Sequence, residues 1–243
     1  MTLALVGHRG AMSEAPENSI ASFSAAEQIG VDEIETDVRI SADGRLFLLH
    51  DANLDRVAAG PDGRGLGAAA ALPWSVICGV DIGSGERVPT LEQLYEATTR
   101  TIQLEIKDPA VIEALAGYFG DHRQDAERTV LTSFSVDAMA AVSELLPDLR
   151  RGVIISSWTE AIDHPGGPEA LIKETGSLRI HTGWEGLTAD AVSGLHAAGL
   201  QIHGWPCRDR ADLEVALDLG LDGTTSDDPR TVRQWLDGRS GGR

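Results

Sequence analysis

Short apolar runs alternate with amphipathic stretches along nearly the whole chain. The runs that predict buried strands are Leu3–Gly7, Glu33–Arg39, Thr101–Ile106, Thr129–Thr132, Arg151–Ile155, Ser177–His181, Gln201–Gly204 and Leu221–Thr225. The stretches that predict helices are Ser19–Ile29, Leu91–Thr99, Pro109–Gly120, Val136–Leu146, Pro168–Thr175, Ala189–Ala198, Arg210–Leu219 and Pro229–Leu236. Alternation of this kind indicates βαβ units and a parallel sheet.

The number of these elements favours one fold class. Eight strands and eight helices in 243 residues favour an α/β protein of the (β/α)8 TIM barrel type, which typically takes about 250 residues. An open doubly wound sheet is the alternative, but no Gly-x-Gly-x-x-Gly follows the first strand, so a dinucleotide-binding fold loses its main support. We predict one barrel domain over residues 1–238 and a flexible tail at 239–243.

One segment interrupts the alternation. Residues 51–89 are rich in Gly, Ala and Pro and show weak periodicity. Just before them, Arg39–Leu46 contains Asp43-Gly44 and predicts a hairpin that leads into Leu46–His50. We interpret residues 51–89 as a small subdomain inserted after the second barrel strand.

Polar clusters occur at or near the ends of several apolar runs in the first part of the chain. They are His8-Arg9-Gly10, Glu17-Asn18, Glu35-Thr36-Asp37, His50-Asp51 and Glu105-Ile106-Lys107. A folded protein gains no stability from gathering such groups unless they bind something. The pattern therefore predicts a functional site at the carboxyl ends of the first strands, where barrel enzymes place their active sites.

The carboxylates of these clusters suit a metal ion. Residues i and i+2 of a strand point to the same side, so Glu35 and Asp37 should converge on one point. With Glu105 from a neighbouring strand they form a hard-oxygen set that fits Mg2+ or Ca2+ better than zinc. The alternative is a surface ion-pair network of Glu35 and Asp37 with Arg39 and Lys107.

The histidines and cations suggest acid–base work on an anion. His8 and His50 titrate near neutral pH, so the pair can serve as general base and general acid. A lone histidine at either place would more often be a structural hydrogen bonder. Arg9 suits a phosphate or carboxylate, which its guanidinium can bind through two hydrogen bonds. Lys107 is a second cation for the same anion.

The sequence leaves the roles of four further residues open. Glu17 precedes the helix cap at Asn18, and it either provides a favourable charge there or orients a histidine or the substrate. Trp205 either forms an apolar wall for a substrate or packs under a loop. His181 and His203 end predicted strands and can face the barrel mouth.

The charge and the sequence of the chain restrict the binding partners and the cellular compartment that we expect. A formal net charge of −18 argues against nucleic acids and anionic membrane surfaces. The start MTLALVGHRG lacks the features of a secretory signal, and no apolar run reaches the length of a membrane span. We therefore expect a cytoplasmic protein with reduced cysteines at Cys78 and Cys207. Its oligomeric state is left open.

The ordered set of motifs resembles the glycerophosphodiester phosphodiesterases. That family's pattern is His-Arg-Gly, Pro-Glu-Asn, Glu-x-Asp, His-Asp and Glu-x-Lys, matched here by His8-Arg9-Gly10, Pro16-Glu17-Asn18, Glu35-Thr36-Asp37, His50-Asp51 and Glu105-Ile106-Lys107. Further similar stretches are Gly83–Leu91, Leu131–Phe134, Pro147–Arg150, Gly204-Trp205 and Gly223–Asp227. The resemblance covers nearly the whole chain.

The resemblance implies a barrel with a small insertion and metal-dependent hydrolysis of a glycerophosphodiester to sn-glycerol 3-phosphate and an alcohol. It also implies a role for each site residue: Glu35, Asp37 and Glu105 hold the metal, His8 and His50 are the acid–base pair, Arg9 and Lys107 bind phosphate, and Glu17 and Trp205 support the substrate. Pro206-Cys207-Arg208 replaces the usual Thr-Val-Asn after the tryptophan. That difference leaves the alcohol group undefined.

Two other functions are compatible with a barrel. The first is phospholipase D-like hydrolysis of lysophospholipids, which needs an apolar surface near the mouth. The acidic charge and the absence of a membrane segment favour a small soluble substrate instead. The second is a binding module without turnover, which should lack at least one of the expected catalytic groups. All of them are present.

Overall fold

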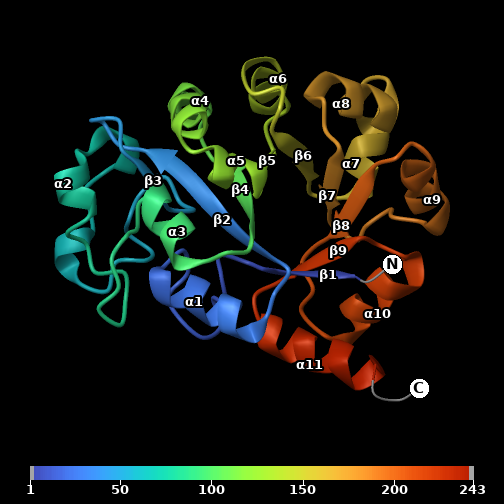
Figure 1. Cartoon of the computed structure of the whole chain (residues 1–243), viewed down its shortest axis with the longest axis horizontal. Helices are drawn as coiled ribbons and strands as arrows, with labels where there is room; N and C mark the ends of the chain where they lie inside the picture. Colours follow the sequence, from blue (N-terminus) through green and yellow to red (C-terminus); the bar gives the residue numbers. More distant parts are fainter. Residues whose placement is uncertain (1–2, 241–243) are drawn as a thin grey trace.

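The computed structural model describes residues 3–240, in which eight parallel strands close into a barrel (Figure 1). The barrel strands are β1 (Ala4–Gly7), β2 (Glu33–Ile40), β4 (Thr101–Ile106), β5 (Thr129–Ser133), β6 (Arg150–Ile155), β7 (Arg179–Thr182), β8 (Gln201–Gly204) and β9 (Gly223–Ser226). They pair in this order, and β1 closes the ring by pairing with both β2 and β9. The prediction of a (β/α)8 TIM barrel is confirmed.

The longer helices surround the strands, as Figure 1 shows. They are α1 (Ile20–Ile29), α3 (Leu91–Ala97), α4 (Ile112–Asp121), α6 (Val136–Leu145), α8 (Gly167–Thr175), α9 (Ala189–Ala197), α10 (Arg210–Leu219) and α11 (Pro229–Ser240). Each corresponds to a predicted helix. The structure adds three short ones that the periodicity did not reveal, α2 (Trp74–Ile77), α5 (Arg123–Glu127) and α7 (Trp158–Asp163). They are too short to show a helical repeat of apolar residues.

Local sequence signals set the ends of several helices. Ser19 and Thr90 each form a capping box at the start of α1 and α3. Gly30 and Gly220 end α1 and α10 in the left-handed conformation, which glycine adopts without a steric penalty. These caps explain why the helix boundaries follow the sequence so closely.

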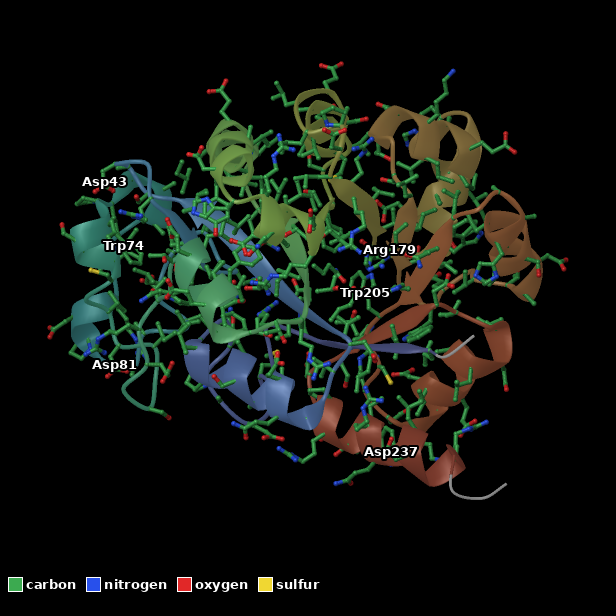
Figure 2. All side chains as sticks on the ribbon, in the orientation of Figure 1. Asp43, Trp74, Asp81, Arg179, Trp205 and Asp237 are labelled. Carbon is green, nitrogen blue, oxygen red and sulfur yellow. The ribbon has the colours of Figure 1, made fainter. Side chains whose placement is uncertain are left out.

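The inserted segment carries its own hydrophobic cluster. β3 (Leu46–Leu48) pairs antiparallel with β2, with Phe47 opposite Arg39, which confirms the predicted hairpin. Phe47 of β3 packs into this cluster with Leu54, Ala58 and Ile77. The backbone N–H of Trp74 donates to Asp43 Oδ1 at 2.8 Å, which joins the insertion to the turn between β2 and β3, and Figure 2 labels both residues on the same side of the molecule. The insertion therefore has a small hydrophobic core that is separate from the core of the barrel, and β3 connects it to β2.

The end of the chain differs from the prediction. α11 continues to Ser240, so it includes the first residues of the segment 239–243 that was expected to be a tail. Residues 241–243 lie outside the described part of the chain. Cys78 and Cys207 are both free thiols, as expected. Among residues 3–240, no helix is long and apolar enough to cross a membrane.

Candidate active site

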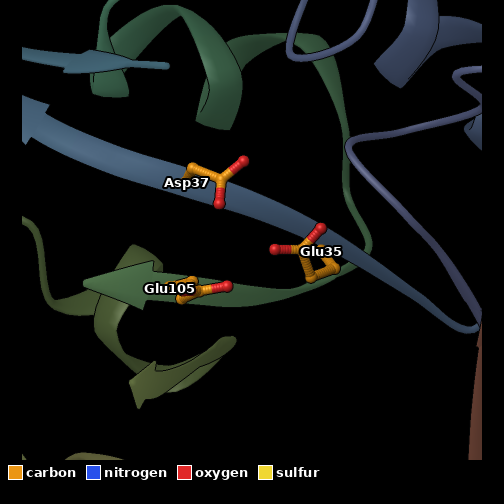
Figure 3. A group of neighbouring side chains, drawn as sticks. All are labelled: Glu35, Asp37 and Glu105. Carbon is orange, nitrogen blue, oxygen red and sulfur yellow. The ribbon is translucent and has the colours of Figure 1, made fainter. Parts of the chain in front are cut away.

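Three buried carboxylates meet at the carboxyl ends of β2 and β4. Glu35 and Asp37 are two residues apart on β2, so their side chains lie on the same side of the strand. Asp37 is directly opposite Glu105 of β4 in the parallel register. One ligand oxygen from each of the three lies within 4.8 Å of the others, and all three side chains are buried. Figure 3 shows the carboxyl groups gathered between the two strands. The predicted convergence of the i and i+2 side chains is therefore realised in the fold.

The electrostatics of this cluster call for a cation. Burial, and then the charge of Asp37, raise the pKa of Glu35 far above its usual range. The same two causes raise the pKa of Glu105. Among the described residues, Glu35 Oε1 and Asp37 Oδ1 are buried without a hydrogen-bond partner. Buried acceptors that repel one another and have no donor fit a divalent ion bound by oxygen.

Asp37 is also held by side chains around it. Asn18 Nδ2 donates to Asp37 Oδ2 at 2.8 Å, while Asn18 Oδ1 accepts from the Thr36 hydroxyl at 2.7 Å. Asn18 adopts a left-handed φ of 52°, and its side chain is buried beside β2. From the sequence, Asn18 and Ser19 are both candidate caps of the first helix, and Asn18 also belongs to the Pro16-Glu17-Asn18 motif. In the structure Ser19 is the cap, and Asn18 orients a carboxylate of the cluster.

His8 lies between this cluster and Asp227, the residue that follows β9. Its Nε2 is 3.8 Å from Glu35 Oε2, and its Nδ1 is 2.5 Å from Asp227 Oδ1. Burial lowers the pKa of His8, but the hydrogen bond to Asp227 and the charge of Glu35 outweigh this, so its pKa is raised overall. From the sequence, Asp227 belongs to the stretch Gly223–Asp227 that resembles the family, but it had no predicted role. Its position in that stretch was the one sequence feature that could have indicated a role for it.

His50 has a carboxylate partner of its own. Its Nδ1 lies 2.7 Å from Asp51 Oδ1. Burial lowers the pKa of His50, and the charge of Asp37 and the hydrogen bond to Asp51 offset that effect only in part. The hydrogen bond from Arg56, followed by smaller effects that include the bond to His50, lowers the pKa of Asp51 to about 2. Asp51 is therefore ionised at neutral pH and holds one nitrogen of the imidazole.

The two predicted cations contact the carboxylates. Arg9 Nη1 donates to Glu17 Oε1 at 2.9 Å, and Arg9 Nε lies 3.5 Å from Asp37 Oδ2. Lys107 Nζ donates to Glu105 Oε1 at 2.7 Å and lies 3.5 Å from Asp37 Oδ1. Arg9 has a left-handed φ of 51°, and its backbone N–H donates to Glu35 Oε2 at 3.0 Å. A strained arginine held in this way is typical of a functional site.

A cavity of about 260 Å³ opens beside these groups. Charged and polar side chains form one part of its wall: His8, Arg9, Glu35, His50, Gln103, Glu105, His181, Thr225 and Asp227. Phe134, Ile154, Trp205 and Pro206 form an apolar wall. The rings of Phe134 and Trp205 meet edge to face, with centroids 5.7 Å apart. Trp205 projects toward the centre of the barrel in Figure 2. Glu17, Asp37 and Lys107 contact the lining groups and are not part of the lining themselves.

His181 and His203 occupy the barrel interior. Both are buried, and their ring centroids lie 5.2 Å apart. Burial, followed by the charge of Arg179, pushes the pKa of each far below its usual value, so both imidazoles are neutral. His181 lines the cavity, whereas His203 packs behind it against Gly223. Both strand ends allowed a histidine to face the barrel mouth, and of the two only His181 lines the cavity.

Comparisons with known proteins agree with this site. The sequence model of the glycerophosphoryl diester phosphodiesterase family matches residues 8–231. A glycerophosphodiester phosphodiesterase of Caldanaerobacter subterraneus is 29% identical over 96% of this chain and 97% of its own. A solved glycerophosphodiester phosphodiesterase of Agrobacterium tumefaciens is 28% identical, with a TM-score of 0.74 over 96% of this chain and 100% of its own.

A further solved structure extends the fold comparison. A phosphodiesterase of Oleispira antarctica, in complex with the product sn-glycerol 3-phosphate, superposes with a TM-score of 0.83 at 24% identity and covers 97% of both chains. The fold and the family match define a phosphodiesterase built on a (β/α)8 barrel. The chain belongs to the glycerophosphoryl diester phosphodiesterase family.

Proposed function

We propose that this protein hydrolyses glycerophosphodiesters, such as glycerophosphocholine and glycerophosphoethanolamine, to sn-glycerol 3-phosphate and an alcohol. The observation that carries the proposal is the buried group of Glu35, Asp37 and Glu105, which adjoins His8 and His50 in one cavity. Family membership and the product named in the Oleispira antarctica structure support the reaction.

Glu35, Asp37 and Glu105 are the proposed ligands of one divalent cation, Mg2+ or Ca2+. Their unpartnered oxygens and raised pKa values fit such an ion. When bound, the ion supplies Lewis-acid stabilisation of the negative charge that develops on the phosphoryl oxygens. Asn18 and Lys107 keep the carboxylates oriented toward it.

The two histidines are the proposed acid–base pair. One accepts the proton of the nucleophile, either water or the substrate's own glycerol hydroxyl, as the new phosphorus–oxygen bond forms; in the second case water then opens the resulting cyclic phosphate. The other donates a proton to the leaving alcohol as the old phosphorus–oxygen bond breaks. Asp227 and Asp51 each hold the Nδ1 atom of their histidine, so Nε2 is the nitrogen proposed to exchange the proton. Proton transfer at Nε2 then requires no reorientation of the ring.

The remaining residues are proposed to bind the substrate. Arg9, which lines the cavity, binds the phosphate together with Lys107 and balances the acidic cluster. Glu17 supports Arg9 through their 2.9 Å ion pair. Trp205 lies on the apolar wall and packs against a carbon-bearing part of the substrate.

Alanine substitution of each histidine tests the reaction. His8→Ala and His50→Ala are each expected to remove most release of sn-glycerol 3-phosphate from glycerophosphocholine in the presence of Mg2+. Circular dichroism should show an intact fold, because neither side chain belongs to the hydrophobic core. Wild-type rates in both variants would overturn the proposal.

A second candidate has its own supporting observation. Phe134 is 43% exposed and lies beside Trp205 at the cavity, so an apolar chain has a surface to rest on. Phospholipase D-like hydrolysis of lysophospholipids is the corresponding alternative. Comparing kcat/KM for glycerophosphocholine and lysophosphatidylcholine separates the two, and a preference for the lysophospholipid would favour the alternative.

A further inference from the structure

Arg56 of the insertion joins two carboxylates, Asp51 and Glu17, and each of them bonds a residue that lines the cavity. Its Nε donates to Asp51 Oδ2 at 2.6 Å. Its Nη1 and Nη2 donate to the two oxygens of Glu17 at 2.6 and 2.8 Å. Asp51 in turn bonds His50, and Glu17 bonds Arg9. One guanidinium therefore links His50 to Arg9, both of which line the cavity.

The insertion fixes the position of this guanidinium. Arg56 lies in a turn between Leu54 and Ala58, which are nearly fully buried members of the insertion's hydrophobic cluster. The backbone N–H of Ala58 donates to the carbonyl of Leu54 at 2.9 Å and closes that turn. The Arg56 backbone is thus anchored, although its side chain is about half exposed. A planar guanidinium with bonds on two edges holds both carboxylates in one geometry.

Arg56 is not among the residues that line the cavity. The side chains that it bonds, Asp51 and Glu17, do not line the cavity either, but they contact residues that do. From this geometry we propose that Arg56 is a positioning residue: it holds His50, through Asp51, and Arg9, through Glu17, at a fixed separation within the cavity. The proposal rests on the proposed phosphodiester hydrolysis. It also assigns the insertion a task in that reaction, because the insertion carries Arg56.

The first experiment compares two arginines of the insertion. Arg56→Met removes the link, and Arg87→Met is the matched control, since Arg87 forms a similarly exposed ion pair with Asp81 at 3.0 Å. Figure 2 shows Asp81 at the end of the insertion away from Trp205. With glycerophosphocholine and Mg2+, Arg56→Met is expected to lower kcat/KM by about 10- to 100-fold, the range for residues that orient active-site ligands. Arg87→Met should stay within about twofold of the wild type.

The second experiment asks whether Arg56 acts through its two partners. In a background that already carries Glu17→Gln and Asp51→Asn, adding Arg56→Met is expected to cost less than about twofold further activity, because the link is already broken. Arg56→Lys should be intermediate, since one ammonium cannot match both carboxylates at once. A purely structural role would give the full loss in either background.

The third measurement does not depend on turnover. The imidazole 1H and 15N resonances of His50 are expected to shift in Arg56→Met but not in Arg87→Met, with the exposed His122 as an internal reference. An inactive wild type would overturn the proposed hydrolysis, while the resonances still report on the positioning of His50. An active wild type, with Arg56→Met as active as Arg87→Met and His50 unmoved, overturns the positioning role.

Discussion

His8 Nδ1 lies 2.5 Å from Asp227 Oδ1, although 219 residues separate the two in sequence. The contact joins the residue after β1 to the residue after β9, the neighbouring strands that pair where the barrel closes. A histidine from the start of the chain thus depends on a carboxylate from its end for orientation. Closure of the barrel is therefore a condition for the proposed chemistry as well as for stability.

Asp227→Asn is expected to lower kcat/KM by about 10- to 100-fold, because an amide does not hold the His8 ring in the same way. It should also lower the pKa of His8, since the Asp227 bond is the main contribution that raises it. An NMR titration of His8 and the pH profile of kcat/KM measure both effects. Asp148→Asn, at an exposed site, is the control. An unchanged titration would contradict the pairing.

Metal binding is expected to stabilise the fold through Glu35, Asp37 and Glu105. A ligand at 100 times its Kd adds about 2.7 kcal/mol to the free energy of unfolding. For a chain of this size this corresponds to a rise in Tm of about 5–11 °C. Thermal unfolding with EDTA and with Mg2+ or Ca2+ measures the rise. Glu35→Gln should abolish most of it, whereas Glu96→Gln, an exposed residue of α3, should retain it. An equal rise in both variants would place the ion elsewhere.

The metal-free protein is expected to lose stability as pH rises above neutral. Burial, and then the charge of Asp37, raise the pKa values of Glu35 and Glu105, so the folded state binds more protons than the unfolded state above the ordinary carboxyl pKa. The free energy of unfolding therefore falls as pH rises toward the folded pKa values. The raised pKa of His8 acts in the same direction, because its stabilisation is lost as pH passes the folded pKa.

Denaturant titrations in EDTA between about pH 7 and pH 9 measure this dependence, because the lowered pKa values of His181 and His203 make stability rise with pH only below that range. Glu35→Gln should flatten it, since one of the repelling carboxylates is gone. Saturating Mg2+ should also reduce it, because a bound cation favours the ionised carboxylates. Stability that rises with pH in EDTA would mean that the cluster is not strained in the folded protein.

The apolar wall is expected to affect substrate choice more than stability. Phe134 is 43% exposed, so Phe134→Ala should change the unfolding free energy by less than a core substitution, which costs about 3–5 kcal/mol. It should change the ratio of kcat/KM between glycerophosphocholine and glycerophosphoethanolamine, whose alcohols differ in apolar surface. Leu145→Ala, also exposed, is the control. An unchanged ratio would place the alcohol elsewhere.

Much of this molecule could be read from local patterns in its sequence. The alternation of strands and helices gave the barrel, and the two-residue period of a strand predicted that Glu35 and Asp37 share a side. The turn at Asp43-Gly44 gave the hairpin of β2 and β3. These features depend on backbone geometry over a few residues, and for that reason a single sequence reveals them.

The partners of the site residues depend on the tertiary structure. Spacing along the chain does not indicate that Asp227 meets His8, that Asn18 holds Asp37 or that Arg56 links Asp51 to Glu17. These contacts form only when the ring closes and the insertion folds back over the first loop. His203 follows the same rule, since its place at a strand end did not show that it packs inside the barrel.

The sequence by itself thus determined the barrel and the kinds of group available for chemistry, because both follow from short-range periodicity and residue type. The tertiary structure alone decided which groups face one another and which are neutral. Those outcomes depend on burial and on charges brought together from distant parts of the chain, as the raised pKa of Glu35 and the lowered pKa of His181 illustrate.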